Sequence, residues 1–157
     1  MVFEINILGS GSVNFAFGRH HTSQMLSLNH NYYLIDCGEG TQIQLACYKV
    51  KIGKLRAVFI SHLHTDHYGG LIGIINIINM QDRKKPLVIY APRGLDEIIT
   101  TQLRFSETEL TYDLQFVLTQ NQSPAVILDN AELSVETIPL QHRVACTGFL
   151  FREKANR

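Results

Sequence analysis

The segment 61–67 constrains the fold of this chain more than any other part of the sequence. It reads Ser-His-Leu-His-Thr-Asp-His and follows directly after the apolar stretch 57–60. At a strand end, alternate side chains point to the same side, so we expect His62, His64 and Asp66 to converge on one point. Imidazole and carboxylate groups are ligands for zinc and similar ions. The run predicts a metal site after a buried strand; the alternative is a polar loop that happens to be rich in histidine.

Composition narrows the class of protein. A chain of 157 residues with 45% hydrophobic and 18% charged residues is expected to form one domain with a real core. Its net charge of zero does not favour a generic nucleic-acid binder, which usually has a basic face. Basic residues cluster at 49–56 and 83–85. We interpret both clusters as solvated surface, with phosphate contact as the alternative.

The expected cellular location follows from apolar runs and cysteines. No apolar run reaches the roughly 20 residues that span a membrane, and the N-terminus does not resemble a signal peptide. Cys37, Cys47 and Cys146 are odd in number and form no CxxC pair, which predicts reduced thiols rather than a disulfide frame or a thiolate metal site. We therefore expect a cytoplasmic protein with no membrane partner.

Alternation and apolar runs predict a mixed order of strands and helices. The segment 71–80 is nearly all apolar and too long for most strands, so a buried helix is expected there. Other helices are predicted at 40–50 and at about 94–105, and strands at 2–8, 25–28, 32–35, 57–60, 87–90, 114–118, 125–127, 133–138 and 148–151. This order suits a sheet covered by helices on one face and packed against another layer on the other.

Several strings resemble those of a known family. The histidines and aspartate of 62–67 resemble the HxHxDH signature of the metallo-β-lactamase superfamily. The segment 34–42, which reads LIDCGEGTQ, is similar to a segment of ribonuclease Z, the tRNA 3′-processing endonuclease. Further matches lie at 8–12, 19–23, 54–62, 90–94 and 140–149, so the resemblance runs in order through the chain. It identifies residues 1–157 as a single metallo-β-lactamase-like domain, the N-terminal half of a ribonuclease Z.

The resemblance implies a fold and a set of metal ligands. The fold is of the α/β (α+β) class, an αββα sandwich of which this chain supplies about one half. His62, His64 and His142 would hold one Zn²⁺, Asp66 and His67 would hold a second, and Asp66 would act as the catalytic proton acceptor. From spacing alone, a lone histidine such as His142 is more often a hydrogen-bonded residue than a ligand.

The implied activity is metal-dependent removal of 3′ trailers from precursor tRNA. The family's later bridging aspartate, later histidine and tRNA-gripping arm have no counterpart in these residues, so the chain is expected to be truncated after Arg157 and weakly active or inactive alone. We expect the unpaired apolar sheet face and the segment 71–80 to associate as a homodimer. Two alternatives stay open: another hydrolase of the superfamily, and a non-catalytic metal-binding fragment.

Overall fold

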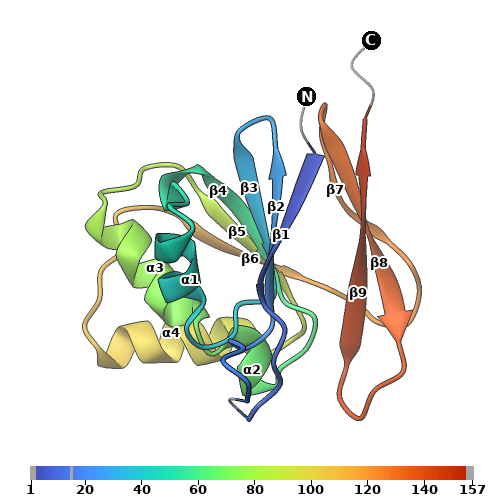
Figure 1. The fold of residues 1–157 in the computed structure, drawn as a ribbon, viewed down its shortest axis with the longest axis horizontal. Helices are drawn as coiled ribbons and strands as arrows, with labels where there is room; N and C mark the ends of the chain where they lie inside the picture. Colours follow the sequence, from blue (N-terminus) through green and yellow to red (C-terminus); the bar gives the residue numbers. More distant parts are fainter. Residues whose placement is uncertain (1–2, 15, 155–157) are drawn as a thin grey trace.

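Two β-sheets and a layer of helices make up the computed structural model, which describes residues 3–14 and 16–154 (Figure 1). The larger sheet has six strands in the order of the chain, and its first three are antiparallel while the rest are parallel. These strands are β1 (Phe3–Gly9), β2 (Ser23–Leu28), β3 (Asn31–Ile35), β4 (Leu55–Phe59), β5 (Leu87–Ala91) and β6 (Leu114–Leu118). Each predicted strand up to residue 118 corresponds to one of them, although Val2 lies outside the described residues.

The smaller sheet lies against the other face of the larger one (Figure 1). Its three antiparallel strands are β7 (Val126–Asp129), β8 (Leu133–Leu140) and β9 (Cys146–Glu153). Four segments form the helical parts: α1 (Thr41–Cys47), α2 (Thr65–Tyr68), α3 (Leu71–Met80) and α4 (Leu95–Phe105), with a short 3-10 turn η1 (Ile52–Lys54). Helices α1, α3 and α4 cover one face of the larger sheet, which confirms the predicted mixed layers.

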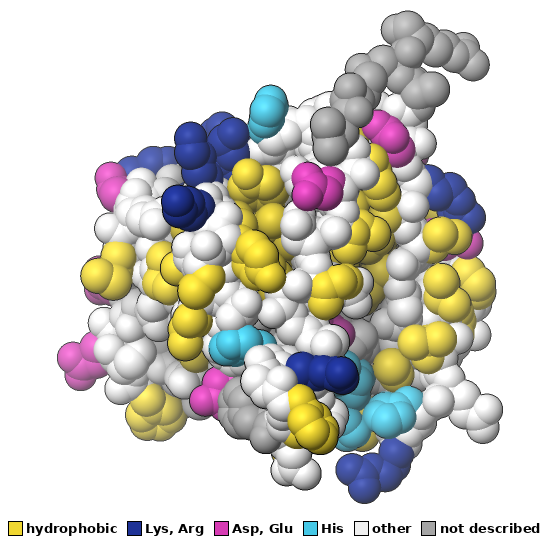
Figure 2. All heavy atoms as spheres, viewed as in Figure 1, with side chains coloured by type: hydrophobic (Ala, Val, Ile, Leu, Met, Phe, Trp, Pro, Cys, Tyr) yellow, Lys and Arg dark blue, Asp and Glu magenta, His cyan; other side chains and the backbone are white. Residues whose placement is uncertain are grey.

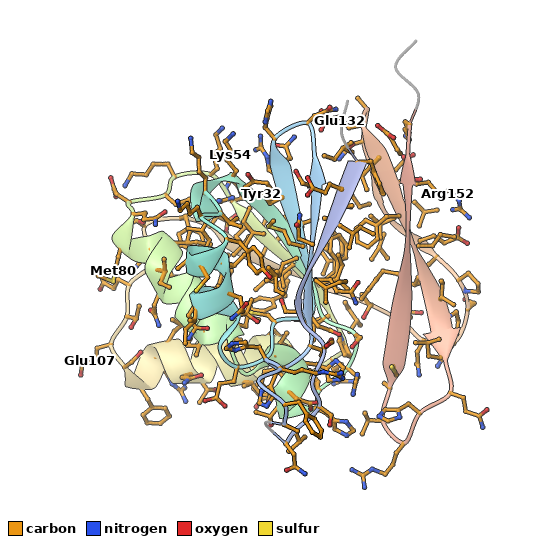
Figure 3. The ribbon with its side chains drawn as sticks, viewed as in Figure 1. Tyr32, Lys54, Met80, Glu107, Glu132 and Arg152 are labelled. Carbon is orange, nitrogen blue, oxygen red and sulfur yellow. The ribbon has the colours of Figure 1, made fainter. Side chains whose placement is uncertain are left out.

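Helix α3 is buried as its composition predicts. Leu71, Ile74, Ile75 and Ile78 are 0% exposed in the core between the helices and the larger sheet. Met80, at the end of the helix, is 86% exposed and projects away from the sheets (Figure 3). Because its apolar residues pack inside the chain itself, α3 does not provide the open apolar face that was expected of it. None of the described helices is both long and apolar enough to cross a bilayer.

Phe59 stands at the centre of the core between the two sheets. Its side chain is 0% exposed and stacks on Tyr90 with 4.7 Å between ring centroids. From the smaller sheet, Phe149 and Phe151 approach edge-on at 5.4 and 5.1 Å. Such aromatic pairs add packing energy beyond their buried area. These contacts pack the C-terminal end of β4, just before the histidine run, between the two sheets.

Hydrogen bonds also join the two sheets at the end farthest from α2. Glu132 accepts hydrogen bonds from the side-chain amides of Asn29 and Asn31, at 3.1 and 3.0 Å. In Figure 3, Glu132 lies near the tip of the β2–β3 hairpin, and Arg152 projects outward from β9. The packed aromatic core and these contacts hold the smaller sheet in one position relative to β4.

An open groove separates β1 from β9 at one edge of the two sheets. We call it the seam, and Ile5, Leu26 and Phe151 are among the residues that line it. Phe3, Ile5 and Ile7 alternate along edge strand β1 and are 38%, 55% and 54% exposed. Apolar side chains are visible along this seam in Figure 2. Among the described residues, no helix covers the outer face of the smaller sheet, so three layers of an αββα sandwich are present.

Candidate metal centre

Three histidine rings come together at one end of the sandwich. His62 and His64 lie in the loop after β4, and His142 lies in the loop after β8. One ring nitrogen from each histidine lies within 4.8 Å of the others. His64 Nδ1 is 3.0 Å from His62 Nε2 and 3.5 Å from His142 Nε2. Histidine side chains gather at this end of the molecule in Figure 2.

Three imidazole nitrogens within 4.8 Å of one another are a donor set of the kind that can hold a metal ion. Tetrahedral bonds of about 2.0–2.1 Å place ligand nitrogens about 3.3–3.4 Å apart, and the two short nitrogen separations lie on either side of that value. Burial, and then the neighbouring rings of His67 and His64, lower the pKa of His62 to about 4. At neutral pH His62 is therefore uncharged and has a lone pair available for a metal ion.

Strand alternation does not produce this convergence, contrary to the expectation from the sequence. Strand β4 ends at Phe59, and the helix α2 begins at Thr65, so the histidines lie in a loop and Asp66 lies on a helix. The loop between β4 and α2 brings the rings of His62 and His64 edge to face, with His62 Nε2 next to His64 Nδ1. His142, which spacing alone could not assign, enters from the smaller sheet.

Asp66 and His67 form a neighbouring pair on α2. Asp66 is 6% exposed, and its Oδ2 lies 3.7 Å from His67 Nε2. The helix lies very close to Gly38 in the loop after β3. A Cβ added to Gly38 would lie only 2.3 Å from the backbone oxygen of Asp66. Only glycine permits this approach. The backbone thus places the carboxylate and the imidazole beside the three-histidine cluster.

Asp36 supports the rings from the end of β3. Because β3 and β4 are parallel neighbours, their C-terminal ends lie side by side. Asp36 has the uncommon left-handed φ of 55° and is 7% exposed. Its Oδ2 accepts a hydrogen bond from His67 Nδ1 at 2.8 Å. Asp36 therefore orients an imidazole ring of the candidate site.

Two further side chains at the site had no predicted role. Ser61 Oγ lies 3.0 Å from His62 Nδ1, and Cys146 Sγ lies 3.8 Å from the same nitrogen. Burial raises the pKa of the Cys146 thiol, so it stays protonated at neutral pH. Cys37 is 0% exposed, and burial raises its pKa to about 12, as expected of a small core residue. The residue types alone do not indicate either contact with His62.

A groove of about 430 Å³ leads from the seam between the sheets to the metal centre. Ile5 and Phe151 line its apolar end, and Asp36, His62 and Cys146 line the end near the rings. The histidine cluster is therefore accessible from the open side of the sandwich.

Comparisons with known proteins find relatives over nearly the whole chain. A family model described as "Anti-Pycsar protein Apyc1" matches residues 3–155. Ribonuclease Z of Cytophaga hutchinsonii is 46% identical over 98% of this chain and 49% of its own length. Ribonuclease Z of Bacteroides fragilis is 42% identical over 98% of this chain and 50% of its own length. The chain thus spans about half the length of the curated relatives it matches.

Solved structures extend the likeness to the fold. The short form of human tRNase Z has a TM-score of 0.85 and 30% identity, covering 95% of this chain and 64% of its own. The metallo-beta-lactamase fold protein YhfI of Bacillus subtilis has a TM-score of 0.70 at 22% identity, covering 94% of this chain and 58% of its own, and it shows the fold alone. The chain therefore belongs to the family that the Apyc1 model describes, has the metallo-β-lactamase fold, and is similar over nearly its whole length to about half of a ribonuclease Z.

Proposed function

We propose that this chain carries the zinc-binding part of an endoribonuclease that removes 3′ trailers from precursor tRNA by hydrolysing a phosphodiester. The observation that carries the proposal is the meeting of His62, His64 and His142, of which the last two are 78 residues apart in the chain. The relatives named ribonuclease Z and the likeness to human tRNase Z support tRNA as the substrate class. Basic side chains lie beside the gathered histidines in Figure 2, which suits a polyanionic substrate.

Each residue has a defined part in this proposal. A zinc ion held by three neutral imidazoles supplies Lewis acidity and generates hydroxide from water near pH 7. His62 Nε2, His64 Nδ1 and His142 Nε2 are the donor atoms that would hold it. Asp66 and His67 would contribute to a second ion, and Asp66 would accept the proton of the attacking water. The buried carboxylate of Asp36 keeps His67 oriented.

An assay with precursor tRNA tests the activity. We expect the purified chain to bind zinc and to cleave the 3′ trailer weakly or not at all, because it spans about half of the relatives' length. Cleavage should stop on chelation and return when zinc is restored. Cleavage that ignores the chelator would contradict the proposal. Zinc binding without any cleavage would instead favour a non-catalytic metal-binding fragment, and preference for a thioester, lactam or sulfate ester would favour another hydrolase.

We further infer that the chain works in the cytoplasm. Cys37, Cys47 and Cys146 are all free thiols. Unpaired cysteines are typical of a reducing compartment, which supports that location.

We also propose that a second copy of the chain covers the open seam. Phe3, Ile5 and Ile7 form an apolar strip on edge strand β1, and the groove beside them is lined by Leu26 and Phe151. Contiguous exposed apolar surface on edge strands usually marks an interface. A two-fold arrangement buries the same strip on both copies, which is the simplest closed assembly.

A charge placed in the seam should separate the copies. Ile5→Lys is expected to shift the chain from dimer to monomer in sedimentation velocity, because it puts a charge into an apolar interface. Ile43→Lys is the matched control, since both isoleucines are 55% exposed and Ile43 lies on helix α1. A monomeric wild type, or equal sedimentation of the two variants, would rule out this interface.

A further inference from the structure

We propose that Ser61 is a positioning residue that fixes the ring protons of the metal-site histidines. Its hydroxyl connects the Asp36 carboxylate to His62, so that His62 holds its proton on Nδ1 and offers Nε2 to the metal. The role of the metal rests on the proposed function, whereas the positions of the ring protons do not.

The Asp36 carboxylate accepts three hydrogen bonds, from Ser61 and His67. Its Oδ1 accepts a hydrogen bond from the backbone N–H of Ser61 at 2.8 Å. Its Oδ2 accepts one from the Ser61 hydroxyl at 3.0 Å and one from His67 Nδ1 at 2.8 Å. An ionised carboxylate can only accept, so all three partners must donate. His67 therefore has its proton on Nδ1, and its Nε2 faces Asp66.

Because the Ser61 hydroxyl donates its hydrogen to Asp36, it also determines which nitrogen of His62 carries the proton. A serine hydroxyl has one hydrogen, and here that hydrogen points at Asp36. Towards His62 Nδ1 at 3.0 Å, and towards His67 Nδ1 at 3.1 Å, the Ser61 oxygen can then only accept. A neutral imidazole has one N–H, so His62 Nε2 is left with a lone pair. That nitrogen is the one that faces His64 and the proposed metal position.

Backbone contacts hold Ser61 in place for this role. The backbone oxygen of Ser61 accepts a hydrogen bond from Thr147 N–H on β9 at 3.0 Å, which ties it to the smaller sheet. On the other side, Asp36 N–H donates to the backbone oxygen of Phe59 at 2.8 Å. The hydroxyl is thus positioned by both sheets.

Cys146 is the other neighbour of His62 Nδ1. Its sulfur lies at 3.8 Å, against 3.0 Å for the Ser61 oxygen, and a thiol is a weak hydrogen-bonding partner. Ser61 is therefore the group that decides the tautomer. Removal of either side chain leaves the backbone contacts intact, which gives a matched pair of variants at one ring nitrogen.

Long-range ¹⁵N–¹H correlation spectra of the metal-free chain at neutral pH test the assignment directly. We expect Nδ1–H tautomers for both His62 and His67 in the wild type. Ser61→Ala should change the tautomer of His62 and leave that of His67, which still donates to Asp36. Ser61→Thr should restore the wild-type pattern because it keeps the hydroxyl. Cys146→Ala should leave it unchanged.

Zinc affinity, measured by competition with a coloured chelator, is the second readout. Ser61→Ala should lose about 10–100-fold, as is usual when an outer hydrogen-bond partner of a metal ligand is removed, and Ser61→Thr should lose little. A wild-type His62 with its proton on Nε2, or a His62 tautomer that ignores Ser61→Ala, would overturn the assignment. If the predicted tautomers appear but no zinc binds, the proposed function fails and the role of Ser61 in setting the tautomer stands.

Discussion

His64→Asn is expected to lower zinc affinity more than about a hundredfold and to abolish metal-dependent cleavage. Loss of an outer hydrogen-bond partner already costs ~10–100-fold, and His64 is itself one of three donors. Its Nδ1 is the nitrogen that lies closest to both other rings, at 3.0 and 3.5 Å. Its removal therefore takes away the nitrogen that lies next to both other ligands. Equilibrium dialysis and a precursor-tRNA assay measure the two effects.

His30 provides the matched control for this change. It is exposed in the turn between β2 and β3, at the end of the sheet away from α2 (Figure 1). Its φ is 64°, a region that asparagine tolerates, so His30→Asn should keep both fold and zinc affinity. If His64→Asn bound zinc as tightly as His30→Asn does, His64 could not be a ligand.

Phe59→Ala is expected to cost about 3–5 kcal/mol of unfolding free energy, the usual range for a buried phenylalanine. The ring is 0% exposed and contacts Tyr90, Phe149 and Phe151, so its loss opens a cavity between the sheets. Against a typical stability of about 5–15 kcal/mol, this change removes a large share. Urea denaturation followed by circular dichroism measures it.

Phe105→Ala is the corresponding control, because that ring is 79% exposed at the end of α4. A surface change of this kind should stay within about 0.5 kcal/mol. Equal unfolding midpoints for the two variants would mean that the sheets are not joined through Phe59.

The elements of the fold could largely be predicted from local pattern, whereas their ends could not. The nearly all-apolar segment 71–80 forms the helix α3, which was predicted because its length exceeds that of most strands. The predicted helix 40–50 ends earlier, at Cys47, since Lys49 turns left-handed with φ 55°. The predicted strand 148–151 extends to Cys146–Glu153, because pairing with β8 recruits polar residues that have no apolar alternation.

The candidate ligands could be proposed from the sequence, but their geometry could not be predicted from it. Clustered histidines indicate candidate metal ligands in any fold. His62 and His64 could therefore be proposed as ligands without knowing the structure. Their convergence depends on a loop and a short helix instead of a strand end. His142 and Asp36 reach the site only through the packing of the second sheet and the parallel pairing of β3 with β4. Ser61 carries no chemical signal until its neighbours are placed.

We expect this chain alone to form a three-histidine metal centre. A crystal structure grown with zinc, with anomalous diffraction collected on both sides of the zinc absorption edge, tests it most directly. We expect one strong anomalous peak about 2.0–2.2 Å from His62 Nε2, His64 Nδ1 and His142 Nε2. A peak bound by other side chains, or zinc-saturated crystals with no peak between these rings, would show that the three histidines do not form the metal site.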